Sequence, residues 1–408
     1  MVYEKLSTQA IDNSEMARPR PASNGMVIVI DGRPLQDKFC GGVGLYTFNL
    51  LRAIFSLDKE NEYHIFYNAR RRLNAPEFKE YGNVAVHHFQ WPNRFLNLSL
   101  RFLRRPKIDK LIFDEKRCDL FFMPNLNFAA LSLDTKLVTV VHDLSFEHFP
   151  ECFSYKTRLW HRLINPRALL YRADHIIAIS EHTRDDLNET YQVSASKMTV
   201  VYPGLTIDPG DNAYGDDGAV SASLRMIGSN YILYFGALDA RKNLESLVEA
   251  YELYATDVGN KGSLPNLVLA GARGSATLRL KKQIAKSKLR DKIFLLENPS
   301  EEEKHYLYLR AALFVYPSFY EGFGFPPLEA YAHSVPAIVS SASSMPEVCG
   351  GAAFLVNPWN IVEIKEGMRI MLNDTALRKK YIEAGKKRLE QFSWQKCAQE
   401  VLQVFKKL

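Results

Sequence analysis

The segment 312–339, "ALFVYPSFYEGFGFPPLEAYAHSVPAIV", contains the pattern that decides the fold. It begins with a short apolar run at 312–316, and the absence of polar alternation is typical of a strand buried on both faces. A glycine-rich loop follows, then the helix-favouring "PLEAYAH", and a second apolar run closes the segment at 335–339. This strand–helix–strand order predicts a parallel sheet covered by helices.

The same alternation extends outward in both directions. In the first half we expect strands at 26–30, 63–67, 84–88, 120–123, 137–141, 175–179 and 198–202. In the second half we expect them at 231–235, 266–270, 293–296, 312–316, 335–339 and 353–356. The segment between these halves, 203–230, has little periodicity and is rich in Gly, Asp, Asn and Ser, which is typical of a linker. The sequence therefore predicts an α/β protein with two doubly wound, Rossmann-like domains facing each other across a cleft.

These patterns divide the chain into five segments. They are a disordered tail at 1–25, a first domain at 26–205, a linker at 206–229, a second domain at 230–385, and a C-terminal helix at 386–408 that we expect to pack back on the first domain. In the second domain, an amphipathic helix is predicted against the sheet by five apolar residues on one face: Leu244, Leu247, Val248, Tyr251 and Tyr254.

Composition limits the class of protein. The chain has 408 residues, and 47% hydrophobic with 24% charged residues is ordinary for a soluble globular protein. The net charge of +6 is too small and scattered to argue for nucleic-acid binding. Five cysteines without C-x-x-C spacing predict reduced thiols in the cytoplasm. Neither a signal-peptide pattern nor an apolar run of transmembrane length is present in the sequence.

In doubly wound sheets, ligands bind outside the carboxyl ends of the strands, so the loop after 312–316 is a candidate site. It carries Glu321, and we expect Glu329 in the first turn of the following helix, where anions bind. Gly322 and Gly324 would let backbone amides approach a ligand with hydroxyls and phosphates, such as a nucleotide sugar. The alternative is a tight strand–helix turn with one capping acid.

Two further segments have phosphate-binding character. Arg241 and Lys242 follow the strand 231–235 and are placed for a diphosphate, unless they are a solvated surface pair. The glycine-rich start of "CGGVGLYTFNLL" (40–51) opens a helix, as phosphate loops do. It matches a dinucleotide fingerprint only in part, because the third glycine is absent, which disfavours NAD binding and an oxidoreductase.

His142 and Asp143 end the strand 137–141, where an imidazole can donate to a sugar hydroxyl or a developing charge. The alternative is a histidine whose hydrogen bonds are satisfied within the strand end. A metal site is not expected, because His142 and His148 lack ligand spacing and no acidic pair accompanies them.

The segment 94–110 is predicted to form one helix with a basic side and an apolar side. The basic residues are Arg94, Arg101, Arg104 and Arg105, and the apolar ones are Phe95, Leu98 and Phe102. Such helices lie on anionic membranes, which predicts peripheral contact with the inner membrane face. The alternative is a core-packed helix with a solvated basic face.

The order of seven motifs resembles the glycosyltransferase family 4 group of retaining, nucleotide-sugar-dependent enzymes with the GT-B fold. They are "GGVGLYTFNLL", "VHDLSF", "IAISEHTRDDL", "VVYPG", "YFGALDARKNLESLVEAY", "YPSFYEGFGFPPLEA" and "SSMPEVCGGAAFLVNP". The resemblance covers residues 26–408. Its most specific parts are Glu-x7-Glu in "EGFGFPPLE" and the "RKN" after the first strand of the second domain.

The resemblance implies a role for each acid and cation. Glu321 would hold hydroxyls of the donor sugar and Glu329 the ribose, while Lys242 and Arg241 would neutralise the diphosphate. His142 would lie near the anomeric carbon.

Backbone groups complete the implied donor site. Amides around Phe323 and Gly324 would meet the sugar, and those of Gly41 and Gly42 would face the phosphates from the other domain. Gly322, Leu328 and Glu297 are further donor-side candidates, the last beside an expected base pocket at 296–299. No cofactor, metal or protein nucleophile is implied, because the departing phosphate oxygen would accept the acceptor's proton.

One departure and several alternatives remain at this point. Many relatives carry Arg where this chain has Ala237, so the phosphate role rests on Lys242 first. The favoured activity is transfer of a hexose, mannose in the first instance, from a GDP- or UDP-linked donor to a glycan or lipid-linked acceptor. The alternatives are a nucleotide-sugar epimerase, a starch or sucrose synthase, or a catalytically silent nucleotide-sugar-binding module.

Overall fold

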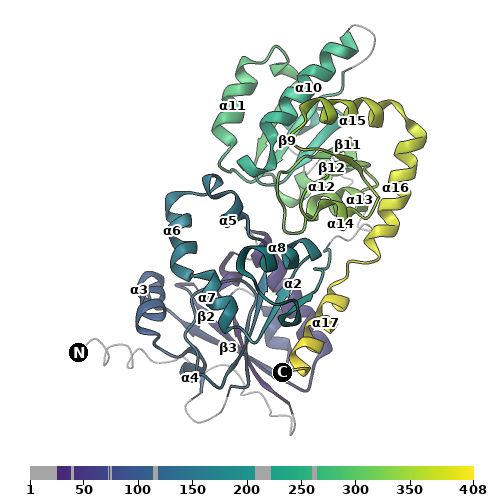
Figure 1. The fold of residues 1–408 in the computed structure, drawn as a ribbon. Helices are drawn as coiled ribbons and strands as arrows, with labels where there is room; N and C mark the ends of the chain where they lie inside the picture. Colours follow the sequence, from purple (N-terminus) through teal and green to yellow (C-terminus); the bar gives the residue numbers. More distant parts are fainter. Residues whose placement is uncertain are drawn as a thin grey trace.

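The structure, a computed structural model, describes residues 25–37, 41–71, 73, 76–113, 118–206, 222–259 and 264–408. The predicted tail lies outside the described residues except for Gly25, and so does most of the predicted linker. In Figure 1 two α/β domains are stacked end to end, the first below the second.

The first domain is built on a parallel sheet of seven strands in the order β3-β2-β1-β4-β5-β6-β7. The strands are β1 (Val27–Asp31), β2 (Glu62–Asn68), β3 (Val84–Phe89), β4 (Leu120–Met123), β5 (Lys136–Val141), β6 (His175–Ala178) and β7 (Met198–Val200). The main helices are α2 (Gly42–Leu57), α5 (Ser145–His148), α6 (Tyr155–Ile164), α7 (Pro166–Arg172) and α8 (Glu181–Tyr191). Each expected strand is present, and β1, β2 and β4 are buried along their whole length, as expected for strands of a sheet covered on both faces.

The second domain repeats this architecture with six parallel strands in the order β10-β9-β8-β11-β12-β13. The strands are β8 (Tyr231–Phe235), β9 (Leu267–Gly271), β10 (Ile293–Glu297), β11 (Ala311–Tyr316), β12 (Ala337–Ser340) and β13 (Phe354–Val356). The helices are α9 (Ala222–Arg225), α10 (Leu244–Val258), α11 (Thr277–Lys286), α12 (Glu301–Arg310), α13 (Phe325–Ala332), α14 (Met345–Cys349), α15 (Ile361–Asn373) and α16 (Thr375–Leu389). The five apolar residues predicted to face the sheet from α10 are all buried, and the two-domain parallel fold is confirmed.

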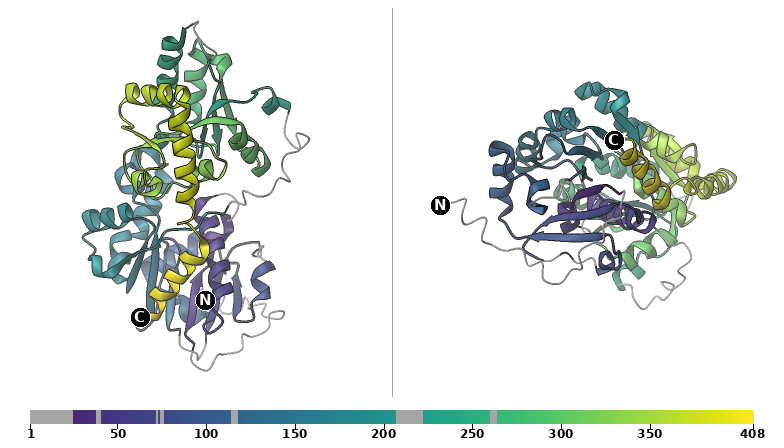
Figure 2. Two further views of the ribbon diagram at one scale, coloured as in Figure 1. Left: turned by 90° about the vertical axis from the view of Figure 1, so that its right-hand side faces the viewer. Right: turned by 90° about the horizontal axis from the view of Figure 1, so that it is seen from below.

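The last helix, α17 (Trp394–Lys406), returns to the first domain and packs along α2 (Figure 2). Phe405 contacts Phe122 with ring centroids 5.2 Å apart, and Trp394 contacts Tyr46 at 5.6 Å. The chain therefore crosses between domains after Leu389, so that residue 386 lies inside α16. Gly204 lies against this crossing, because a Cβ there would come within 2.2 Å of the backbone nitrogen of Trp394.

The prediction of a single helix at 94–110 is wrong. The chain forms α3 (Asn93–Leu98), a wider π-type turn at Ser99–Leu103, a left-handed residue at Arg104 (φ 51°) and then α4 (Ile108–Ile112). Pro106 explains the break, because it lacks an N–H and disfavours helical backbone in the residue before it. None of the described helices combines the length and the apolarity needed to cross a bilayer.

Candidate active site

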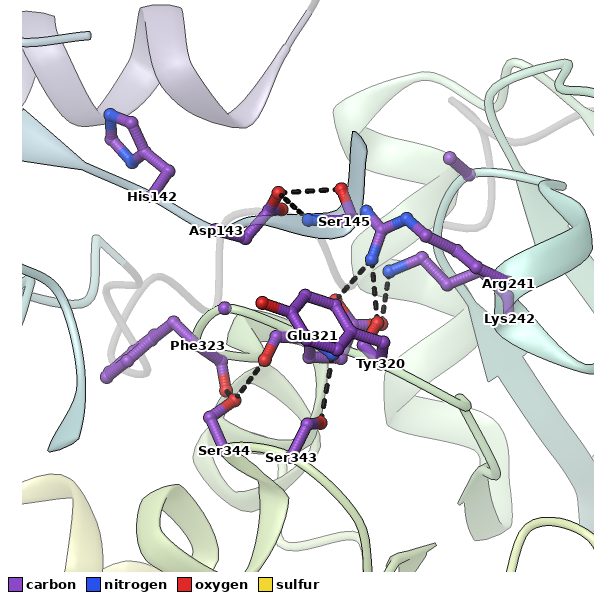
Figure 3. Close-up of polar contacts among 12 residues, drawn as sticks. His142, Asp143, Ser145, Arg241, Lys242, Tyr320, Glu321, Phe323, Ser343 and Ser344 are labelled. Atoms are coloured by element: carbon purple, nitrogen blue, oxygen red, sulfur yellow. Dashed lines mark hydrogen bonds and ion pairs between the residues drawn. The ribbon is translucent and has the colours of Figure 1, made fainter. Parts of the chain in front are cut away.

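The loop between β11 and α13 carries Glu321, whose side chain is buried at the carboxyl end of the second sheet. The short turn η8 (Ala240–Lys242) follows β8, and β8 pairs with β11, so Arg241 and Lys242 reach the same point. Lys242 Nζ donates to Glu321 Oε1 and, over 2.7 Å, to the hydroxyl of Tyr316. Arg241 Nη1 lies 3.1 Å from Glu321 Oε2 (Figure 3). The structure thus brings together three predicted site residues.

Electrostatics keep this Glu321–Lys242–Arg241 cluster charged. Burial by itself would raise the pKa of Glu321, but the charges of Lys242 and Arg241 lower it to about 2. Burial and the neighbouring Arg241 lower the pKa of Lys242 to about 8, although Glu321 opposes them. At neutral pH the cluster therefore carries one net positive charge, held where water is largely excluded.

Two serines, Ser343 and Ser344, form hydrogen bonds with the backbone of the β11–α13 loop. Glu321 N–H donates to Ser343 Oγ over 2.9 Å, and Ser344 Oγ lies 2.9 Å from the carbonyl of Glu321 and 2.8 Å from that of Phe323. Gly324 has a φ of +107°, a backbone conformation that residues with a Cβ rarely adopt, so the loop favours glycine at this position. Neither serine was predicted from the sequence. The small polar residues that follow the strand β12 could have indicated them, because the loop after β12 lies at the same edge of the sheet as the loop after β11.

Glu329 lies in the second turn of its helix and not in the first, where it was expected. It is the fifth residue of α13, which begins at Phe325, so its placement in the first turn was wrong. The left-handed Gly324 forms the N-cap and starts the helix one residue before the prolines. Glu329 accepts from Lys304 Nζ at 2.7 Å and from the Tyr308 hydroxyl at 2.9 Å.

Three other second-domain candidates have different surroundings. The side chains of Leu328 and Phe323 are buried in the hydrophobic core. Glu297 ends the edge strand β10 and pairs with Lys281 and, at 3.9 Å, with Arg273. Glu297 is thus held in a separate ion-pair group from the Glu321–Lys242–Arg241 cluster.

On the first-domain side, His142 follows β5 and its Nε2 donates to the carbonyl of Pro124 over 2.8 Å. Its ring meets Tyr46 edge-on at 4.7 Å, and burial lowers the pKa of His142, so the imidazole is neutral. Figure 3 shows the ring turned away from the Glu321–Lys242–Arg241 cluster. Gly41 and Gly42 lie at the N-terminus of α2, and no described atom is within 4 Å of a Cβ added at either.

The two domains touch directly at Gly322. A Cβ there would come within 1.8 Å of the carbonyl oxygen of His142 and 2.7 Å of the Cβ of Asp143. Asp143 in turn accepts hydrogen bonds from Ser145 N at 2.9 Å and Ser145 Oγ at 2.6 Å. The candidate site therefore lies between the carboxyl ends of two parallel sheets, and both domains form its walls.

This arrangement suits an anionic ligand that also carries hydroxyl groups. Arg241 and Lys242 provide positive charge, and Glu321 provides a hydroxyl acceptor. The N-terminus of α2, where the described residues place no side-chain cap on Gly41, provides backbone amides from the facing domain. Among the described residues, no group of three or more His, Cys, Asp or Glu is arranged to hold a metal ion.

Comparison with known proteins gives consistent matches. Residues 40–208 match the family described as "Glycosyltransferase Family 4", and residues 222–388 match "Glycosyl transferases group 1". The chain is 29% identical to the O-antigen chain mannosyltransferase B of Escherichia coli, over 94% of this chain and 100% of that one.

Solved structures share the fold at lower identity. A sucrose-phosphate synthase from Thermosynechococcus elongatus superposes with a TM-score of 0.69 at 17% identity, covering 94% of this chain and 99% of that one. Anabaena Alr3699/HepE, in complex with UDP and glucose, superposes with a TM-score of 0.67 at 17% identity, covering 94% and 100%.

Proposed function

Because the chain belongs to the group 1 glycosyltransferases, with a family 4 domain in its first half, we propose that it transfers a hexose from a nucleoside-diphosphate sugar to a glycan or lipid-linked acceptor in polysaccharide biosynthesis. The observation that carries this proposal is the buried Glu321–Lys242–Arg241 cluster at the mouth of two facing parallel sheets. Mannose is the proposed hexose, since a curated relative that matches 94% of this chain is an O-antigen chain mannosyltransferase.

In this proposal the cluster binds the donor. Lys242 and Arg241 neutralise the diphosphate, and Glu321, oriented by both cations, accepts from sugar hydroxyls. Glu329 accepts from the ribose. Fixed cations lower the barrier because negative charge builds on the diphosphate as it departs.

The proposed reaction retains the anomeric configuration and requires no metal. The bond from the anomeric carbon to the phosphate oxygen breaks, and the acceptor oxygen bonds to the same face of the sugar. The acceptor's proton passes to the departing phosphate oxygen. A neutral His142 and the amides of Gly41 and Gly42 contact the donor from the first domain. Proton NMR of a mannosylated acceptor, formed from GDP-mannose with EDTA present, tests retention and metal independence together.

Peripheral membrane contact through 94–110 is part of the proposal. The apolar side chains of this segment are exposed: Phe95 by 74%, Phe102 by 65% and Leu103 by 63%. Arg94, Arg104 and Arg105 beside them are also exposed. Exposed aromatic residues flanked by arginines suit an anionic bilayer surface, and this supports the proposed peripheral contact with the cytoplasmic face of the membrane. Co-sedimentation with vesicles containing anionic phosphatidylglycerol tests this, with pure phosphatidylcholine vesicles and a Phe95→Ser/Phe102→Ser variant as controls.

Thermal unfolding against GDP, UDP, dTDP, ADP and NAD, without added metal, tests the donor assignment. A ligand at about one hundred times its dissociation constant stabilises the folded state by roughly 2.7 kcal/mol. We expect one nucleoside diphosphate, GDP for a mannosyl donor, to raise the melting temperature while NAD leaves it unchanged. A shift with NAD alone would overturn the proposed activity.

A further inference from the structure

The hydroxyl of Tyr320 bridges the two domains directly beside the candidate site. It accepts from the Leu144 N–H at 3.0 Å and donates to Asp186 Oδ2 at 2.5 Å. Leu144 follows β5, and Asp186 lies in α8, so both partners belong to the first domain. Tyr320 and Asp186 are each only 6% exposed. A tyrosine of the second domain is thus buried in a polar socket of the first.

The same residue is tied to the cationic cluster through its backbone. Tyr320 directly precedes Glu321, and its carbonyl accepts from Arg241 Nη1 at 2.9 Å. Two residues further along, the carbonyl of Gly322 accepts from Ser180 Oγ at 2.6 Å. Ser180 belongs to the first domain and directly precedes α8. The β11–α13 loop is therefore attached to the first domain on both sides of Glu321.

Asp186 is in turn oriented by its own domain. Its Oδ1 accepts from His148 Nε2 at 2.6 Å and from Thr190 Oγ1 at 3.1 Å, which leaves Oδ2 for Tyr320. The socket for the tyrosine hydroxyl is therefore preorganised by groups of the first domain, and His148 also packs against the ring of Tyr320, with ring centroids 5.5 Å apart.

We propose that Tyr320 is a positioning residue for hexose transfer: its hydroxyl, held by Leu144 and Asp186, aligns Glu321 and Arg241 against the first-domain wall when the cleft is closed. This rests on the proposed function. Removing the hydroxyl leaves a buried N–H and a carboxylate oxygen unpaired in the closed state, whereas water satisfies both when the cleft opens. Loss of the hydroxyl therefore favours the open, misaligned state.

The test compares Tyr320→Phe with Tyr251→Phe in the full-length protein. Tyr251 lies in α10, and its hydroxyl donates to the carbonyl of Pro265 over 2.9 Å. The control therefore removes a tyrosine hydrogen bond elsewhere in the second domain. With GDP-mannose as donor, we expect Tyr320→Phe to lower kcat roughly 5- to 100-fold, the factor that matches an unpaired buried polar group. Affinity for GDP alone should change less than threefold, because Lys242 still binds the diphosphate and Glu329 the ribose when Arg241 is misaligned. An unchanged kcat, or an equal loss in the control, would overturn the proposal.

A double-mutant cycle with Asp186→Asn tests whether the two residues act through one another. We expect Tyr320→Phe/Asp186→Asn to be no slower than the slower single variant, since either change already breaks the bridge. Independent, multiplicative losses would contradict a shared role.

Hydrogen exchange separates this inference from the proposed activity. In the unliganded protein, Tyr320→Phe should increase amide exchange in 142–146 and 320–324, while Tyr251→Phe should leave both segments unchanged. If the wild type turns over none of the nucleotide sugars but these amides respond as expected, the activity fails and the interdomain bridge stands. If turnover is normal and the amides do not respond, the bridge fails alone.

Discussion

At the scale of single residues, the charge of Lys242 is the most sensitive feature of the site. Burial and Arg241 lower its pKa to about 8, so the amine loses its proton as the pH rises through that value. If it binds a diphosphate, kcat/KM should fall above pH 8, since this parameter reports ionisations of the free enzyme. We expect Lys242→Arg to abolish this fall, because a guanidinium stays charged.

The contribution of Lys242 to the free energy of unfolding should rise with pH while kcat/KM falls, so a measurement of stability is the control for this prediction. The pKa of Lys242 is lower in the folded chain than the ordinary 10.5, so between these values the unfolded chain binds more protons. This group therefore makes the folded state more stable as the pH rises through that interval. Urea unfolding at pH 7 and pH 9 should confirm that activity is lost without unfolding attributable to Lys242.

At the scale of elements, α8 is capped by a residue of the other domain. Glu347, in α14, accepts from the backbone N–H of Glu181 at 2.6 Å and of His182 at 3.0 Å, and from the Tyr202 hydroxyl at 2.8 Å. A carboxylate at a helix N-terminus is stabilised by free amides and by the helix dipole. Glu347→Gln should therefore lower the free energy of unfolding by about 1–2 kcal/mol in urea titrations.

The exposed Glu249 of α10 provides the matched change for this prediction. Glu249→Gln removes the same charge from the same domain without a contact to α8, and should change stability by less than about 0.5 kcal/mol. Equal effects of the two substitutions would mean that Glu347 contributes only its charge to the protein as a whole, and that the interdomain cap has no energetic weight.

At the scale of the whole molecule, Gly322 limits how closely the domains approach. A Cβ at this position would lie 1.8 Å from the His142 carbonyl oxygen, and backbone cannot yield cheaply there. We expect Gly322→Ala to hold the cleft open and to raise the radius of gyration in small-angle scattering. Gly82→Ala is the control, because no described atom lies within 4 Å of a Cβ at that exposed turn. Scattering identical to the wild type would show that the loop adjusts instead.

Much of this architecture was predictable from local pattern. Each expected strand was recognisable because a strand buried on both faces is predominantly apolar, as Leu120–Met123 and Tyr231–Phe235 illustrate. The position of Glu321, Arg241 and Lys242 was also predictable, since the loops after neighbouring parallel strands share one edge of a sheet. Their pairing with one another was not, because it depends on side-chain geometry across β8 and β11.

The two incorrect helix predictions, at α13 and at 94–110, also have local causes. The start of α13 was misplaced because the left-handed Gly324 caps the helix before the prolines, and the helix at 94–110 was overextended across Pro106. The partners of Tyr320 lie 176 and 134 residues away in the chain, and no periodicity connects them.

The sequence by itself determined the two parallel sheets, their order along the chain and the loops that carry charge, because these follow from hydrophobic periodicity and from glycine and proline positions. The tertiary structure alone decided which charges pair, how far burial shifts their pKa values, and how Tyr320, Gly322 and Glu347 meet the first domain. Those properties depend on distances between residues far apart in the chain, and such distances exist only once both domains are folded and in contact.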